Sequence, residues 1–93
     1  LAFVKNMKNS GVPIYAISAQ NEPDASVDYE SCKINPDSMA LWVGKYLGPT
    51  FAGSGVKVMS PESQNWYGLA NYWPKLKASA DAMKYMDIVA THE

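Results

Sequence analysis

The chain has 93 residues, of which 47% are hydrophobic and 18% charged, and its formal net charge is −1 at pH 7. This composition is typical of a globular domain, and the balanced charges indicate neither nucleic acid nor an anionic membrane as a partner. No apolar run approaches the ~20 residues that a membrane-spanning helix needs. The single cysteine, Cys32, has no partner within the chain, so cysteine content does not indicate a compartment. We expect the chain to be an internal piece of a longer protein.

The first half of the chain predicts a helix, a strand and a second helix. Apolar residues at helical spacing predict a helix that ends near residue 10, with Gly11 as its stop signal. Residues 14–20 form a short apolar run typical of a buried strand, and a polar loop over residues 24–35 follows. Asn, Pro and Asp at residues 35–37 are typical of a helix start, and we expect this helix to reach Leu47 and to end or kink at Gly48-Pro49.

The second half of the chain repeats the alternation. A second strand is predicted over residues 56–60 and is expected to end at Pro61-Glu62, because proline cannot donate a hydrogen bond to a sheet. A loop rich in Trp and Tyr, a helix over residues 71–86 and a third strand over residues 87–92 follow. Exposed aromatic side chains form stacking platforms for sugars, although any single one is more often part of a hydrophobic core.

The alternation of helices and strands predicts an α/β fold with a parallel sheet. The predicted strands start at residues 14, 56 and 88. The distance from the second strand start to the third matches the roughly 30 residues per unit of a (β/α)8 TIM barrel. The distance from the first start to the second is larger, and the longer loop after Pro23 accounts for the extra residues. A doubly wound sheet has the same element order, but no glycine-rich phosphate-binding turn follows a strand. The sequence therefore favours about three βα units of a barrel.

Each predicted strand finishes with an ionisable residue, namely Glu22, Glu62 or His92. These residues are even-numbered, like the apolar residues that precede them, so strict alternation predicts that each shares a face with its series. Active sites of (β/α)8 barrels lie at the carboxyl ends of the strands. We therefore expect the three groups to converge at one face of the sheet.

Glu22 is the candidate for acid–base chemistry. Cleavage of a glycosidic bond needs a carboxylic acid that protonates the leaving oxygen and then, as a carboxylate, activates water. A strand end fixed by Pro23 gives such a residue a rigid place, and Asn21 beside it can bind a sugar hydroxyl. Considered alone, Glu22 is equally well explained as a solvated loop carboxylate.

Longer motifs connect this strand end to a known family. The run Ala16-Ile17-Ser18-Ala19-Gln20-Asn21-Glu22-Pro23-Asp24 resembles the acid/base strand of glycoside hydrolase family 30, although the Asn-Glu-Pro triplet alone is shared by many retaining barrel glycosidases. The resemblance covers nearly the whole chain, and further motifs are similar to the xylan-degrading branch of that family: Tyr29-Glu30-Ser31-Cys32, Ala40-Leu41-Trp42-Val43, Ser60-Pro61-Glu62-Ser63-Gln64-Asn65-Trp66-Tyr67-Gly68 and Ala90-Thr91-His92.

The resemblance implies a role for each site residue. It places the chain at strands four to six of a single catalytic TIM barrel, with Glu22 as general acid/base. It implies a sugar pocket lined by Asn21, Glu62, Gln64 and His92, with Trp66 and Tyr67 as aromatic platforms at its rim. The nucleophile of the family follows the seventh strand, so the resemblance implies none within these residues. No metal or cofactor is implied.

The implied activity is retaining hydrolysis of a β-linked polysaccharide, most closely xylan or glucuronoxylan, by a secreted, extracellular enzyme. Lys33-Ile34-Asn35 departs from the family pattern in a loop that borders a substrate subsite. The resemblance therefore does not decide which glycan is the substrate. The alternatives are a β-1,6-glucanase or glucosylceramidase-type glycosidase, a barrel that binds glycan without catalysis, and an inert gene fragment. Three strands cannot close a barrel, so we expect the isolated chain to be poorly folded and inactive.

Overall fold

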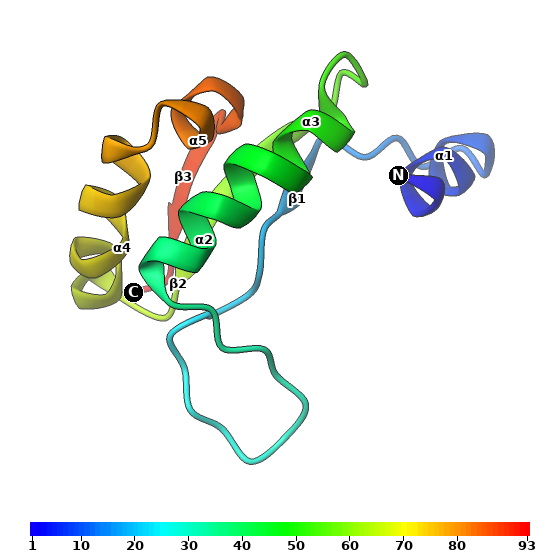
Figure 1. The fold of residues 1–93 in the computed structure, drawn as a ribbon. Coiled ribbons are helices and arrows are strands. Elements are labelled where there is room, and N and C mark those ends of the chain that lie inside the picture. Colours follow the sequence, from blue (N-terminus) through cyan, green and yellow to red (C-terminus); the bar gives the residue numbers. More distant parts are fainter.

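The computed structural model describes residues 1–93 and contains three parallel strands that alternate with helices (Figure 1). The strands pair in the order β1-β2-β3 and are β1 (Ala16–Ser18), β2 (Lys57–Ser63) and β3 (Ile88–Thr91). The helices are α1 (Ala2–Asn9), α2 (Pro36–Trp42), α3 (Gly48–Phe51), α4 (Trp66–Ala78) and α5 (Ala80–Tyr85), and a π-helical segment, η1 (Val43–Leu47), joins α2 to α3. The predicted parallel α/β architecture is confirmed.

The strand boundaries differ from the sequence-based ones. β1 is shorter than the predicted run 14–20, and β2 continues through Pro61 as far as Ser63. The prediction that Pro61 ends the strand is wrong, because a bulge after it lets pairing resume. Pro61 lies opposite Ala90, and the next partner, Thr91, lies opposite Ser63. Glu62 is therefore the extra residue of the bulge.

The helix boundaries differ for reasons that the capping residues explain. Gly48-Pro49 does not end the second helix, because Pro49 lies in the first turn of α3, where a missing N–H is tolerated. α4 begins at Trp66 rather than near residue 71, and the side chain of Asn65 caps it by accepting a hydrogen bond from the backbone N–H of Gly68 at 2.9 Å. The Trp/Tyr-rich segment is thus helical rather than a loop.

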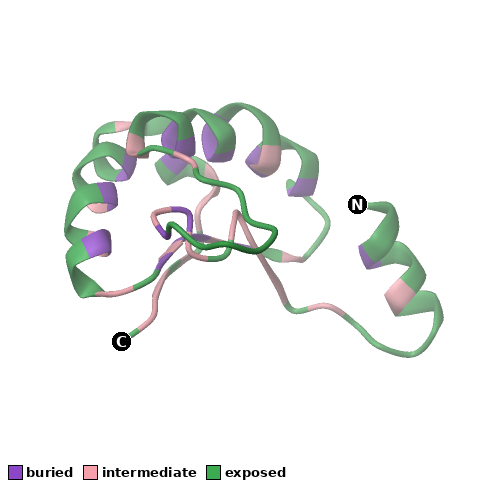
Figure 2. Ribbon diagram, turned by 90° about the horizontal axis from the view of Figure 1, so that it is seen from below, coloured by how far each residue is buried: buried purple, intermediate pink, exposed green.

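The hydrophobic core lies between the sheet and the helices (Figure 2). In this view the helices after β1 form an arc over one face of the sheet and leave the other face uncovered, while the N-terminal helix α1 lies apart at one side. Val58 of β2 is buried in the core, and Ile17 of β1 packs against it from the paired position. The buried residues of the helices that meet them include Met39, Val43, Tyr72, Leu76 and Ala82. None of the helices is long and apolar enough to cross a membrane.

Candidate active site

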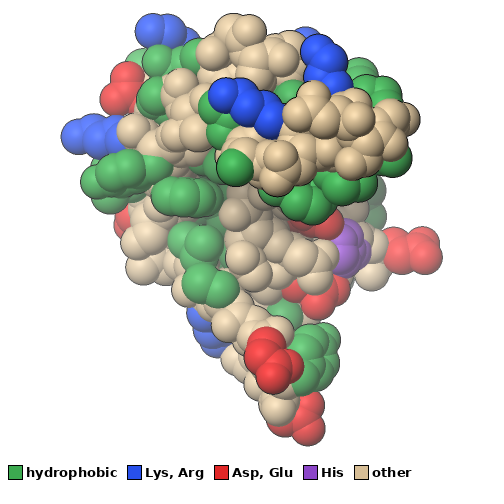
Figure 3. Space-filling view, turned by 90° about the vertical axis from the view of Figure 1, so that its right-hand side faces the viewer, with side chains coloured by type: hydrophobic (Ala, Val, Ile, Leu, Met, Phe, Trp, Pro, Cys, Tyr) green, Lys and Arg blue, Asp and Glu red, His purple; other side chains and the backbone are tan.

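Three ionisable side chains meet where the three strands end. Nδ1 of His92 lies 2.9 Å from Oε1 of Glu22, and Nε2 lies 3.4 Å from Oε1 of Glu62. In Figure 3 the one histidine, in purple, lies between acidic side chains in red. The structure therefore brings together the three strand-end residues that the sequence singled out.

Glu22 is held by its backbone. Its N–H donates to the carbonyl of Glu62 at 2.9 Å, which ties the end of β1 to the bulge of β2. Its carbonyl accepts a hydrogen bond from the N–H of Ala25 at 3.0 Å, and Pro23 between them is fully buried. Glu22 has a φ of 47°, in the left-handed region that costs a non-glycine residue about 1–3 kcal/mol. Such a conformation turns the side chain away from the direction that a regular strand gives.

Glu62 reaches the cluster by a route that strict alternation does not predict. Val58 lies four residues before Glu62, on the same face of a regular strand, and it packs in the core beneath the helices. Continued alternation would therefore place Glu62 on the helix side of the sheet. The bulge and the left-handed φ of 55° at Glu62 reverse that direction. The alternation argument is wrong for this strand, although Glu62 still meets His92.

His92 is anchored by hydrogen bonds at the end of β3. Its backbone N–H donates to the carbonyl of Ser63 at 2.9 Å, and the hydroxyls of Ser63 and Thr91 lie 2.8 Å apart. Ser63 is fully buried, and these bonds fix the ends of the paired strands β2 and β3 to each other. They hold the imidazole between the two carboxylates.

The hydrogen bond to Glu22, followed by the one to Glu62, raises the pKa of His92 above its ordinary value of 6.5. An imidazolium donates from both nitrogens, whereas an ionised carboxylate can only accept. Protonation of His92 therefore satisfies both contacts at once. The cluster carries two carboxylates for one imidazole, and a positive charge on the ring offsets part of their repulsion.

Asp24 is a positioning residue that the sequence reasoning did not single out. Its Oδ1 accepts a hydrogen bond from the backbone N–H of Gln64 at 2.9 Å, which joins the loop after β1 to the loop after β2. A Cβ on Gly68 would lie 2.0 Å from Oδ2 of Asp24, so a larger residue there would displace the Asp24 carboxylate. The sequence signal for this role was the position of Asp24 at the end of the motif that resembles the family's acid/base strand.

A small cavity of about 140 Å³ lies beside Glu22. Asn21, Tyr29 and Glu30 are among the residues that line it. The sequence pattern assigns no role to Tyr29 and Glu30, and the structure places both at the cavity that Glu22 lines. No group of three or more His, Cys, Asp and Glu side chains is arranged to hold a metal ion.

The remaining predicted site residues lie outside the hydrogen-bonded cluster. Asn21 and Gln64 are exposed, and neither side chain bonds to Glu22, Glu62 or His92. Trp66 and Tyr67 are 68% and 85% exposed in the first turn of α4, as aromatic platforms require. Their roles in binding sugar stay predictions.

Several known proteins are similar to this chain in sequence and fold. No family model matches it. The glucuronoxylanase XynC of Bacillus subtilis is 36% identical over 90 residues, which are 97% of this chain and 19% of that protein. The family 30 subfamily 8 xylanase Xyn30A of Clostridium acetobutylicum superposes with a TM-score of 0.81 at 33% identity, over 97% of this chain and 22% of that one. The endo-β1,6-glucanase BT3312 superposes with a TM-score of 0.85 at 25% identity, over 99% of this chain and 21% of that one.

The three strands and their helices match about a fifth of family 30 TIM-barrel chains, which confirms the predicted fold class. The predicted family is confirmed as well, and the chain spans about a fifth of the length of the relatives that it matches. The chain is a fragment of glycoside hydrolase family 30 and matches about a fifth of the xylanase and glucanase chains of that family.

Proposed function

We propose that this chain supplies the acid/base side of a retaining glycoside hydrolase active site, with Glu22 as general acid/base. The observation that carries the proposal is the convergence of Glu22, Glu62 and His92 at the carboxyl ends of adjacent parallel strands. This edge of the sheet is where (β/α)8 barrels place catalytic groups.

Glu22 suits the acid/base role better than Glu62. Oε2 has no hydrogen bond within the chain in either residue, but the side chain of Glu22 is 29% exposed, compared with 19% for Glu62. Glu22 also lines the small cavity next to Asn21 and Tyr29. One oxygen of Glu22 is therefore held by the protein while the other is open to a substrate.

The reaction divides between this chain and the rest of the barrel. Glu22 protonates the glycosidic oxygen as a second carboxylate, beyond these residues, bonds to the anomeric carbon. Glu22 then takes a proton from the water that releases the glycosyl group. Asn21 and Gln64 bind sugar hydroxyls, Trp66 and Tyr67 stack on sugar rings, and residues 1–93 form part of one catalytic domain.

Xylan or glucuronoxylan is the proposed substrate, because glucuronoxylanase XynC and xylanase Xyn30A match the chain at 36% and 33% identity. A polymer of this kind cannot enter a cell, so we propose an extracellular enzyme. The similarity to an endo-β1,6-glucanase makes β-1,6-glucan the comparison substrate. Hydrolysis of β-1,6-glucan without hydrolysis of xylan would show that the substrate is β-1,6-glucan. The acid/base role of Glu22 would be unaffected.

The test is Glu22→Gln in the complete chain that contains these residues. We expect turnover of xylan to fall by about 10³-fold or more, since general acid catalysis contributes about 10²–10⁴-fold. On an aryl glycoside with a very good leaving group, formation of the glycosyl-enzyme should fall by less than about 10-fold, because protonation is then hardly needed. Both rates are measured under identical conditions.

The matched control is Asp28→Asn, which makes the same change to an exposed side chain of the loop after β1. This variant should retain activity on both substrates. Equal losses on the two substrates in Glu22→Gln would refute the acid/base assignment. Xylan hydrolysis by the isolated 93-residue chain would overturn the proposal that the rest of the barrel supplies the nucleophile.

A further inference from the structure

We propose that His92 is a positioning residue for Glu22, and that Glu62 acts through His92 rather than by binding sugar. The inference rests on the proposed acid/base role of Glu22 and deepens it. The family resemblance implies that Glu62 and His92 both line the sugar pocket. The geometry points instead to one hydrogen-bonded unit that ends at Oε1 of Glu22.

Both nitrogens of His92 are occupied by carboxylate oxygens. Nδ1 lies 2.9 Å from Glu22, and Nε2 lies 3.4 Å from Glu62. A ring with both nitrogens engaged has no donor or acceptor left for a sugar hydroxyl. Glu62 faces the ring from the bulge of β2 and Glu22 from the segment after β1, and both raise the pKa of His92, Glu22 more strongly. The next residue, Glu93, is exposed.

The backbone of the site is built to hold this unit. Glu22 and Glu62 both have left-handed φ values, and a backbone hydrogen bond of 2.9 Å joins them. The N–H of His92 is fixed on Ser63, the residue after Glu62. All three members of the unit are therefore tied to one another through the main chain as well as through their side chains.

The unit has a defined effect on proton transfer. Glu22 carries its proton on Oε2 and gives it to the glycosidic oxygen as the bond from that oxygen to the anomeric carbon breaks. The second carboxylate of the barrel forms the new bond to that carbon, and Glu22 is left as a carboxylate. The imidazolium on Oε1 stabilises the new charge on Glu22 and fixes the plane of its carboxyl group.

The second half of the reaction reverses the change at Glu22. A water oxygen bonds to the anomeric carbon, the second carboxylate leaves, and the proton of the water returns to Oε2 of Glu22. His92 keeps its proton throughout. Glu62 balances the charge of the ring and holds its orientation, so its effect on the rate passes entirely through His92.

A double-mutant cycle in the complete chain tests the inference. Glu62→Gln, His92→Gln and the double variant are compared by kcat and KM on an aryl xyloside with a poor leaving group. We expect His92→Gln to lower kcat about 10- to 100-fold, as for the loss of one hydrogen bond to a charged group, with KM within about 2-fold. The double variant should have the same kcat as His92→Gln alone, because the two residues act as one unit.

The pH profile gives a second readout that a purely structural role would not move. Glu62→Gln removes one carboxylate that raises the pKa of His92. The alkaline limb of kcat should therefore move to lower pH in this variant, and His92→Gln should remove that shift. Asp28→Asn should keep the profile of the unmodified enzyme, and Glu62→Gln remains informative if His92→Gln does not fold.

Two results would overturn the inference. Losses from Glu62→Gln and His92→Gln that multiply, together with a raised KM, would show that each contacts substrate separately. An unmoved alkaline limb in Glu62→Gln would show that Glu62 does not act through the ring. Either result can occur while Glu22→Gln still shows its leaving-group dependence, so the two proposals fail separately.

Discussion

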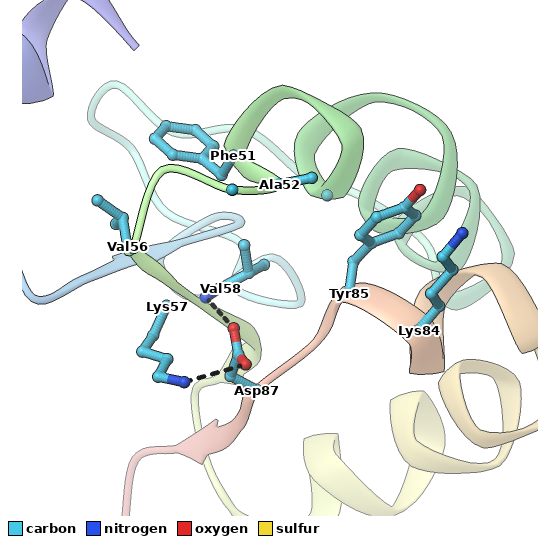
Figure 4. Close-up of a pocket in the computed structure, with 11 residues that line it drawn as sticks. Phe51, Ala52, Val56, Lys57, Val58, Lys84, Tyr85 and Asp87 are labelled. Atoms are coloured by element: carbon cyan, nitrogen blue, oxygen red, sulfur yellow. Dashed lines mark hydrogen bonds and ion pairs between the residues drawn. The ribbon is translucent and has the colours of Figure 1, made fainter.

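At the carboxyl ends of the strands, His92 lies between Glu22 and Glu62. At the amino ends, Asp87 joins β3 to β2: its Oδ2 accepts from the N–H of Val58 at 3.0 Å, and Oδ1 lies 3.5 Å from Nζ of Lys57 (Figure 4). Both ends thus pair a carboxylate with a basic side chain. They differ in what each carboxylate is free to do.

The amino-end carboxylate is fully committed to the protein. Both oxygens of Asp87 have partners, and the single ion pair balances its charge. At the carboxyl ends, two carboxylates share one imidazole, one oxygen of Glu22 has no partner in the chain, and both glutamates have left-handed φ values. Backbone strain and unbalanced charge occur together only at the carboxyl ends, which is where a barrel concentrates function.

The largest effect on stability is expected at the amino end. A Cβ on Gly48 would lie 2.3 Å from Cβ of Tyr85, and this contact cannot be relieved by rotating the ring alone. Gly48→Ala should therefore lower the free energy of unfolding of the complete chain by about 3 kcal/mol, as overpacking does. The measurement is denaturant unfolding, with kcat/KM taken well below the transition.

Lys45→Ala is the control, since Lys45 is exposed in the adjoining segment η1 and its loss should stay within about 0.5 kcal/mol. Gly48→Ala should leave the pH profile and the leaving-group dependence of the enzyme unchanged. A changed pH profile would break the comparison, because it would show that the amino end takes part in the chemistry.

The order of the elements and the parallel sheet could be predicted from sequence because they depend on local patterns. Apolar runs gave the strands, and Asn35 with Pro36 marked a helix start that the structure confirms, with the Asn35 side chain accepting from the N–H of Ser38 at 2.8 Å. The boundary at Pro61 could not be predicted. It depends on a bulge that forms only when β3 pairs alongside.

The site shows the same division. The three ionisable strand ends were recognised as residue types at strand termini, but their mutual contacts depend on two left-handed residues. Glutamate carries no sequence signal for that conformation, unlike glycine or asparagine. Asp24 was missed because its partners, Gln64 and Gly68, are distant in sequence.

An intermediate effect is expected from Asp87→Ala. It removes the acceptor for the N–H of Val58 and the partner of Lys57, and hydrogen bonds to charged groups contribute about 1.5–3 kcal/mol. Because Asp87 is exposed, we expect a loss of about 1–2 kcal/mol in unfolding free energy. Lys57→Met removes the exposed ion pair alone and should cost less than about 1 kcal/mol. Equal losses in the two variants would assign the effect to the ion pair rather than to the backbone contact.

The smallest expected effect on stability is at His92, and its pH dependence separates the two ends of the sheet. The hydrogen bond to Glu22, then that to Glu62, raises the folded pKa of His92 above 6.5. The resulting stabilisation is fully present below the unfolded pKa of about 6.5, and it is lost as the pH rises through the folded value. The difference in melting temperature between the unmodified protein and His92→Gln should therefore shrink as the pH rises from about 5 to 8. The deficit of Asp87→Ala should stay constant over that range, because histidine is the side chain that ordinarily titrates there.

A His92→Gln deficit in melting temperature that grows with pH would show that the ring is bound in its neutral form. The imidazolium would then have no part in holding Glu22.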